Sequence, residues 1–172
     1  MNLKTAWRIV YPKRYLTCLT CAALIGIAFL FGCSAKTEET FTFQGASMLP
    51  TIKDGEKIRI RRFDSGAEFS VKRGDIVLFL YPKDTSKFYI KRVIGLPNET
   101  LEIHEGKAFI NGKELLEPYI DPKLNASRFS QPLVKINEDS YYVLGDNRDN
   151  SSDSRFWGLV PKKNIFARVL DK

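Results

Sequence analysis

Short runs of β-branched and aromatic residues, separated by turn-forming residues, constrain the fold more than any other feature of this sequence. The runs are KIRIRR (57–62), DIVLFLY (75–81), FYIKRVI (88–94), TLEIH (100–104), KAFI (107–110) and YYVL (141–144). Asn111-Gly112 between two runs is typical of a two-residue hairpin turn. Because short strands at this spacing are typical of antiparallel sheets, we expect a mainly antiparallel β-domain that forms a barrel or a sandwich. Residues 117–139 are predicted to be a loop.

An uncharged run, LTCLTCAALIGIAFLFGC, occupies residues 16–33. As a helix it would be about 27 Å long, close to the roughly 30 Å of a bilayer's hydrocarbon core. The residues before it are basic and include no acid (Lys4, Arg8, Lys13 and Arg14). Since basic flanks remain in the cytoplasm, we predict a cytoplasmic segment over 1–15, one transmembrane helix over 16–33 and an extracytoplasmic domain over 34–172. This predicts a single-pass membrane protein whose N-terminus lies in the cytoplasm.

Two alternatives to a retained anchor remain at this stage. Leu30 to Cys33 resembles a lipobox, which would make Cys33 a lipidation site, and ordinary cleavage could follow Ala35. All three interpretations place residues 36–172 outside the cytoplasm. All three cysteines precede this part, so it has no disulfide framework, no thiol nucleophile and no His/Cys metal cluster. We expect neither a cofactor nor a metal.

The positive charge of the chain is concentrated at its N-terminus. The net charge is +7, from 27 basic and 20 acidic residues, and four of the basic residues precede the uncharged run. The rest of the chain therefore has 23 basic against 20 acidic residues. A nucleic-acid-binding protein would need its basic residues gathered on a folded face, so no nucleic-acid partner is expected.

The stretch GASMLPT presents Ser47 in a short turn, as a nucleophile would be presented, but a serine hydroxyl needs a base. The single histidine, His104, falls on the polar side of the TLEIH strand, which disfavours a Ser-His-Asp triad. A lysine is an alternative base when apolar surroundings lower its pKa from about 10.4 toward about 7–8. Lys91 lies inside the apolar run FYIKRVI and is the best candidate. A lysine that extends its amine to solvent is the alternative.

Four motifs in order, SMLPT, RGDIVLF, YIKRVIGLPNE and GDNRDNSSDSRFWG, resemble bacterial type I signal peptidase from about Gly45 to Val160. That family consists of membrane-anchored Ser-Lys endopeptidases that remove signal peptides from exported proteins. The resemblance implies that Ser47 is the nucleophile and Lys91 the general base. It also implies cleavage after small residues, at Ala-X-Ala-like sites, of a substrate strand bound beside the site by β-augmentation.

The resemblance also implies supporting roles for other residues. Ser151 would orient the lysine, Asp153 and Arg155 would form a supporting ion pair, Asp146 and Arg148 would support the structure, Met48 would position the serine and wall the pocket, and Pro50 would fix the turn. The backbone N–H of Ser47 would bind the oxyanion. Some members add a serine side chain where this chain has Gly45, so either a backbone or water donor substitutes here or one hydrogen bond is missing. Asn98 stands where many members have glycine, and because Asn tolerates left-handed conformations the turn should persist.

Larger family members carry a second β-domain, and the stretch between Lys91 and Gly145 leaves room only for a small hairpin cap, over about residues 100–140. The implied partners are preproteins and the lipid bilayer, and we expect a monomer. Phe41, Phe43 and Leu49 are candidates for membrane contact, with core packing as the alternative.

Rival interpretations are a protease that matures other precursors, a silent homologue acting as a binding factor, a self-cleaving repressor-type Ser-Lys protease and an organellar processing peptidase.

Overall fold

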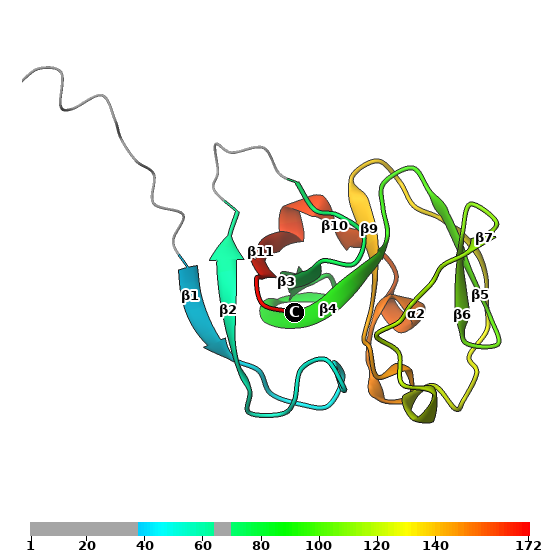
Figure 1. Cartoon of the computed structure of the whole chain (residues 1–172). Helices are drawn as coiled ribbons and strands as arrows, with labels where there is room; N and C mark the ends of the chain where they lie inside the picture. The colour runs from blue at the N-terminus through cyan, green and yellow to red at the C-terminus, as the bar shows by residue number, and fades with distance from the viewer. Residues whose placement is uncertain (1–37, 64–69) are drawn as a thin grey trace, which may run out of the picture. The chain divides into compact units, whose positions relative to one another are not determined.

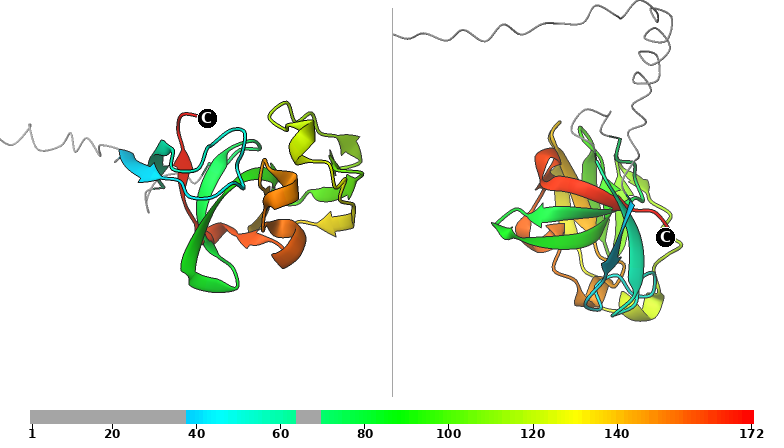
Figure 2. Two further views of the ribbon diagram at one scale, coloured as in Figure 1. Left: turned by 90° about the horizontal axis from the view of Figure 1, so that it is seen from below. Right: turned by 90° about the vertical axis from the view of Figure 1, so that its left-hand side faces the viewer.

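The computed structural model describes residues 38–63 and 70–172, which belong to one unit, Lys36–Lys172. The predicted cytoplasmic segment and anchor lie outside the described residues. In the ranges that are described, no helix combines the length and the apolar character needed to cross a bilayer. The fold consists of two antiparallel sheets, and the views in Figures 1 and 2 agree that the smaller sheet lies at the opposite end of this unit from β1 and β2.

The larger sheet has seven strands in the order β1-β2-β11-β3-β4-β9-β10. Their bounds are β1 Glu38–Thr42, β2 Lys57–Arg62, β3 Ile76–Tyr81, β4 Asp84–Gly95, β9 Ser140–Leu144, β10 Val160–Pro161 and β11 Ile165–Val169. Neighbouring strands are antiparallel throughout. The β1 and β10 strands are edges, so the mainly antiparallel β fold is confirmed but the expectation of a barrel is wrong. Closure would require these two strands to pair, and β10, only two residues long, pairs with β9 alone.

The smaller sheet has four strands in the order β7-β6-β5-β8. Their bounds are β5 Thr100–His104, β6 Lys107–Ile110, β7 Lys113–Glu114 and β8 Gln131–Lys135. The predicted hairpin is confirmed, because β6 and β7 flank Asn111 and Gly112, which both have positive φ. The loop prediction is wrong at β8. Its sequence, QPLVK, has no alternating pattern, and it is a strand because it pairs with β5.

Four short helical turns complete the described fold: η1 Pro122–Leu124, η2 Arg148–Asn150, α2 Ser154–Trp157 and η3 Lys162–Asn164. Two of them follow β9 directly. The Asn147 side chain caps η2 by accepting from the Asn150 N–H, and the Asp153 side chain caps α2 by accepting from the Arg155 N–H. These caps satisfy amides that a short helix leaves unpaired, so the polar motif after β9 folds as two capped turns.

The second half of β4 is buried on both faces, in contrast to the alternating pattern of β2, where only Ile58 and Ile60 are buried. Ile90 packs in the core cluster around Met48 and Ile52, while Ile94 packs in the cluster between β4, β9 and the smaller sheet. The two residues between them, 91 and 92, are therefore held inside the protein although both are charged types. This burial sets up the chemistry of the site.

Candidate active site

The turn that carries Ser47 is anchored to the core by apolar side chains. The Ile52 N–H donates to the Met48 carbonyl at 2.9 Å, and the Leu49 N–H donates to the Ala46 carbonyl at 3.2 Å. Met48 and Ile52 are fully buried in the core. The turn therefore has one side in the core and presents Ser47 on the other. Met48 was expected to wall the pocket, but it lies beneath the turn and is not among the residues that line the cleft.

Lys91 extends from β4 to the serine. Its Nζ donates to Ser47 Oγ at 2.9 Å and to the Ile90 carbonyl at 3.0 Å. Lys91 is only 5% exposed, and both acceptors are neutral oxygens. Burial lowers the pKa of Lys91 to about 8, although the carboxylates of Asp153 and Asp146 act in the opposite direction. The structure thus brings together the two residues that the sequence singled out, with a lysine that loses its proton far more readily than a solvated one.

Ser47 and Lys91 face a cleft with a volume of about 650 Å³. Its walls come from the end of β1, the serine turn, residues 88–91 of β4, and Asn150 and Ser152. Phe41 is half-buried and its ring packs edge-on against that of Phe88 at 5.4 Å. Phe43, however, is 4% exposed and lies in the core. For Phe43 the expectation of membrane contact is therefore wrong, and the core-packing alternative holds.

The loop after β9 holds the backbone of the serine turn. The Asn147 N–H donates to the Ser47 carbonyl, and Asn147 Nδ2 donates to the Ala46 carbonyl, both at 3.1 Å. Gly145 approaches the turn so closely that a Cβ there would lie 2.3 Å from Ser151 Oγ and 2.5 Å from the Ser47 carbonyl oxygen. Glycine is therefore required at this position by lack of space.

Two buried ion pairs flank this loop, and only one of them joins residues that the sequence paired. Arg155 Nε donates to Asp153 Oδ1 at 2.8 Å, with both side chains almost fully buried. Asp146 pairs with Arg92, from Nε to Oδ1 at 2.8 Å and from Nη2 to Oδ2 at 2.6 Å, rather than with another residue of its own motif. The two-point contact is the geometry in which an arginine and a carboxylate bind most strongly.

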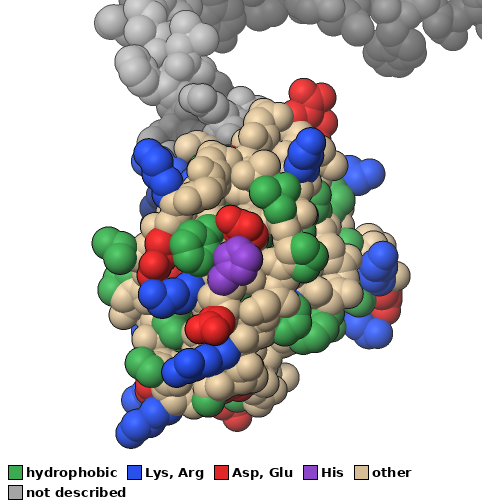
Figure 3. Space-filling view, turned by 90° about the vertical axis from the view of Figure 1, so that its right-hand side faces the viewer, with side chains coloured by type: hydrophobic (Ala, Val, Ile, Leu, Met, Phe, Trp, Pro, Cys, Tyr) green, Lys and Arg blue, Asp and Glu red, His purple; other side chains and the backbone are tan. Residues whose placement is uncertain are grey.

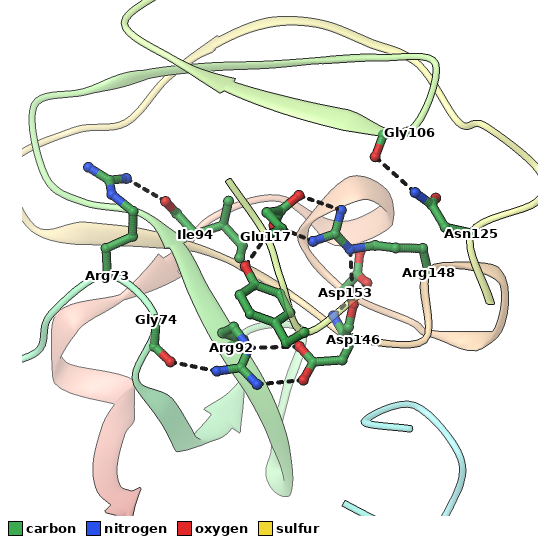
Figure 4. A network of polar contacts seen from close by, with 12 residues as sticks. Arg73, Gly74, Arg92, Ile94, Gly106, Glu117, Asn125, Asp146, Arg148 and Asp153 are labelled. Carbon is green, nitrogen blue, oxygen red and sulfur yellow. Dashed lines mark hydrogen bonds and ion pairs between the residues drawn. The ribbon is translucent and has the colours of Figure 1, made fainter. Parts of the chain in front are cut away.

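Arg148 forms a third buried pair, with a residue that sequence reasoning missed. Its Nη2 donates to Glu117 Oε1 at 2.5 Å, and its Nη1 donates to Glu117 Oε2 at 3.2 Å. Figure 4 shows this pair beside the pair of Arg92 and Asp146. The role of Arg92 could have been inferred from the sequence. Consecutive strand residues face opposite sides, so the Arg92 guanidinium lies on the side of β4 away from Lys91 and needs an acidic partner there. The sequence carries no such signal for Glu117, since it lies in a stretch without strand or helix pattern.

The expected contact between Ser151 and Lys91 is not formed in this structure. Within the described residues, Ser151 Oγ is buried and has no hydrogen-bond partner. Lys91 Nζ is instead engaged by Ser47 Oγ and by a main-chain carbonyl. Ser151 Oγ does lie next to Gly145 and so beside the serine turn.

The backbone next to the serine is shaped by glycine and an aspartate. Gly45 has φ of +106°, which favours glycine, and its N–H donates to Asp54 Oδ1 at 2.7 Å. A Cβ at Gly45 would meet no atom within 4 Å, so backbone conformation rather than space excludes a side chain there. None of the hydrogen bonds of the described residues uses the Ser47 N–H. The turn at Asn98 persists as predicted, with φ of +66°.

His104 lies at the end of β5, in the smaller sheet. Its side chain is 58% exposed and its Nε2 lies 3.1 Å from Glu102 Oε2. Figure 3 shows the histidine on the surface among charged side chains. The prediction of a surface histidine is confirmed.

The chain matches the family model described as signal peptidase, peptidase S26, over residues 14–170. It is 35% identical over 156 residues to signal peptidase I of Leptolyngbya laminosa, covering 85% of this chain and 74% of that protein. It is 37% identical over 153 residues to signal peptidase I P of Bacillus subtilis subsp. natto, covering 84% and 81%. A crystal structure of a signal peptidase I from Enterococcus faecalis V583 is 30% identical, with a TM-score of 0.48, and covers 58% of this chain and 96% of that one.

The structure places a serine hydroxyl within hydrogen-bond distance of a buried amine at one cleft. The chain belongs to the signal peptidase family, peptidase S26, and is an enzyme of that class. The resemblance drawn from the four sequence motifs is confirmed.

Proposed function

We propose that this enzyme removes N-terminal signal peptides from exported preproteins, with Ser47 as nucleophile and Lys91 as general base. The observation that carries the proposal is the 2.9 Å contact between Lys91 Nζ and Ser47 Oγ in a cleft, made by a lysine whose pKa burial lowers to about 8. At neutral pH a useful fraction of such a lysine is neutral, and only the neutral amine accepts a proton.

The reaction is an acyl transfer in two stages. Neutral Lys91 takes the proton of Ser47 Oγ as the oxygen attacks the scissile carbonyl, and the Ser47 N–H binds the oxyanion that forms. Lys91 then gives that proton to the leaving amine, and an ester links the signal peptide to Ser47. In the second stage Lys91 takes a proton from water, the hydroxide attacks the ester, and the proton returns to Ser47 Oγ as the ester breaks.

The edge of β4 beside Lys91 supports binding of the substrate as a strand. The β9 strand pairs with β4 only from Arg92 to Gly95, whereas the cleft is lined by residues 88–91 of the same strand. A substrate strand added here would offer its first and third residues before the cut to the same side, since strand side chains alternate. The rings of Phe41 and Phe88 pack against each other and line the same cleft. They favour small side chains at the first and third substrate residues before the cut.

The remaining parts of the proposal follow the family. Ser151 orients the Lys91 amine once the substrate enters, and the pair of Asp153 and Arg155 keeps the loop after β9 in place. Residues 16–33 anchor the enzyme in the cytoplasmic membrane, with residues 1–15 inside and residues 34–172 outside as a monomer. The active site then lies at the outer face of the cytoplasmic membrane, where a signal peptide emerges.

The test uses the full-length chain in detergent and a preprotein whose signal peptide ends in Ala-X-Ala, with products identified by mass spectrometry. Wild type, Ser47→Ala, Lys91→Ala and Lys107→Ala are compared. Lys107 is the matched control, because its side chain is 64% exposed and pairs with Glu114 on the surface. We expect cleavage after the final Ala by wild type and Lys107→Ala alone. Cleavage that survives in Lys91→Ala would exclude this lysine as the base. A folded wild type that cuts no preprotein would favour a binding role.

A further inference from the structure

The segment from Glu117 to Tyr119, between β7 and η1, joins the smaller sheet to the loop after β9 through buried polar contacts. Glu117 binds the Arg148 guanidinium at both oxygens, and the two side chains are 8% and 3% exposed. Tyr119 donates its hydroxyl to Glu117 Oε1 at 2.7 Å. Burial is the main cause that raises the pKa of Tyr119 well above its usual range, and the negative charge of Glu117 is a second cause. The Tyr119 hydroxyl therefore stays protonated and remains a donor. Glu117 therefore accepts three hydrogen bonds away from solvent.

Arg148 transmits this contact to the start of the serine turn. Its Nε donates to the Gly145 carbonyl at 3.1 Å, and this hydrogen bond connects the two ends of the loop segment 145–148. Between these two residues lies Asn147, whose amide groups hold the carbonyls of Ser47 and Ala46. A shift of Arg148 would therefore move the atoms that hold Ser47.

Tyr119 transmits the contact to the other end of the turn. The Arg92 guanidinium lies 3.9 Å from the centre of the Tyr119 ring, within the range of a cation–π contact. Arg92 in turn binds Asp146, whose Oδ2 accepts the hydroxyl of Thr51 at 2.5 Å. Residues 145–148 thus hold the serine turn at both ends. The Glu117–Tyr119 segment supports this loop through Arg148 and Arg92, and Figure 4 shows Glu117 beside Arg148 and Asp146 beside Arg92.

We propose that Glu117 is a positioning residue for Ser47, acting through Arg148 and Asn147, so that the hairpin cap sets the geometry of the catalytic serine. This inference rests on the proposed function of Ser47. Without the carboxylate, Arg148 keeps a buried charge with a single carbonyl acceptor among its described contacts, and an unpaired buried charge moves toward water. The loop then moves with Arg148 and the Ser47 hydroxyl leaves its attack position.

The experiment compares full-length wild type, Glu117→Gln, Tyr119→Phe and Glu114→Gln in detergent. Glu117→Gln keeps the shape and removes the charge, and Tyr119→Phe removes one hydrogen bond as a milder change. Glu114→Gln is the matched control, because Glu114 lies in the same cap but forms an ion pair exposed to solvent. Steady-state cleavage gives kcat and KM well below the unfolding temperature of each variant. Hydrogen exchange measured by mass spectrometry reports the backbone amides of residues 45–51.

A positioning role predicts a drop in kcat of about 10- to 100-fold for Glu117→Gln with little change in KM, since a misplacement of about 1 Å costs this much. Tyr119→Phe should show a smaller drop, and Glu114→Gln none. Amides of residues 45–51 should exchange faster in Glu117→Gln. A lower unfolding temperature with unchanged kcat and unchanged exchange would overturn the inference and leave Glu117 a purely structural residue. If wild type cuts no preprotein, the proposed function fails, while the exchange data still decide whether Glu117 holds the turn.

Discussion

Replacing Lys91 with methionine should stabilise the protein at pH 7 while abolishing cleavage. Lys91 is 5% exposed, and its pKa falls from 10.5 to about 8 because burial disfavours the charged amine. At about 1.4 kcal/mol per pH unit, this difference corresponds to about 3 kcal/mol of unfavourable burial. Methionine has a similar length and no charge, so this cost disappears. Loss of the hydrogen bonds to Ser47 Oγ and to the Ile90 carbonyl costs about 1 kcal/mol each, which leaves a net gain of about 1 kcal/mol at pH 7.

The sign of the effect depends on pH in a defined window. Below pH 8 the lysine is charged in both the folded and unfolded states, so the full cost of burial applies. Between about 8 and 10.5 the unfolded state binds more protons than the folded state, so the unfolding free energy of wild type rises with pH. Above 10.5 the lysine is neutral in both states. The advantage of Lys91→Met should therefore shrink through this window and turn into a deficit of about 2 kcal/mol at its upper end, where only the loss of the two hydrogen bonds remains.

The assay is urea unfolding of full-length wild type and Lys91→Met in detergent at pH 7, 9 and 10.5, followed by tryptophan fluorescence. Trp157 is a suitable reporter because it is 8% exposed and would become solvated on unfolding. The control is Lys107→Met, in the smaller sheet, where the side chain is 64% exposed. It should show no such pH-dependent difference. A stability difference for Lys91→Met that is the same at all three pH values would refute the idea that Lys91 is buried at a cost.

Three further outcomes follow from the site. Asp146→Ala leaves Arg92 buried without its carboxylate, so urea unfolding should show a loss of about 3–5 kcal/mol; a loss near zero would mean that the pair is not buried. Gly145→Ala places a methyl group 2.5 Å from the Ser47 carbonyl oxygen, so steady-state cleavage should fall about 100-fold. The pH profile of kcat/KM should rise to a plateau with a midpoint near 8, because only neutral Lys91 accepts a proton; a profile that falls over this range would contradict the proposed base.

The Ser-Lys contact was predicted from the resemblance of the four motifs, because the strand pattern alone left open whether Lys91 extends its amine to solvent. The strand around Lys91 could be predicted directly, because the apolar run FYIKRVI is a local pattern. The placement of His104 was predictable for the same reason, since alternation in TLEIH assigns it to the polar face. The Asn111-Gly112 hairpin likewise depends only on two adjacent residues.

Features that depend on distant partners were not predictable from one sequence. Whether the larger sheet closes depends on contacts between its first and last strands, and β8 is a strand only because β5 lies beside it. The partner of Arg148 is Glu117, 31 positions away, and no local pattern marks that carboxylate as buried. The sequence motif indicated that Asp146 is structural, but only the fold shows that Arg92 is its partner.

The last prediction concerns how neighbouring charges set the proton affinity of the base. The carboxylates of Asp153 and Asp146 raise the pKa of Lys91, and the Arg155 guanidinium lowers it. Arg155 binds Asp153 directly, with both side chains buried, so it offsets a negative charge that would otherwise favour the charged amine. Without Arg155, Asp153 still accepts the Gly145 N–H at 3.1 Å and keeps its place in the loop. Arg155→Gln should therefore raise the pKa of Lys91 and move the midpoint of the kcat/KM profile to higher pH.

A charge-preserving variant separates this electrostatic effect from a change of shape. Arg155→Lys keeps the positive charge but loses the two-point contact with Asp153, so its midpoint should stay close to that of wild type even if its plateau falls. Equal midpoint shifts in Arg155→Gln and Arg155→Lys would show that geometry rather than charge is responsible. If neither midpoint moves, the ion pair does not act on the base at all. The predicted pattern, a shift in the glutamine variant alone, would mean that a buried arginine allows Lys91 to be neutral close to two carboxylates.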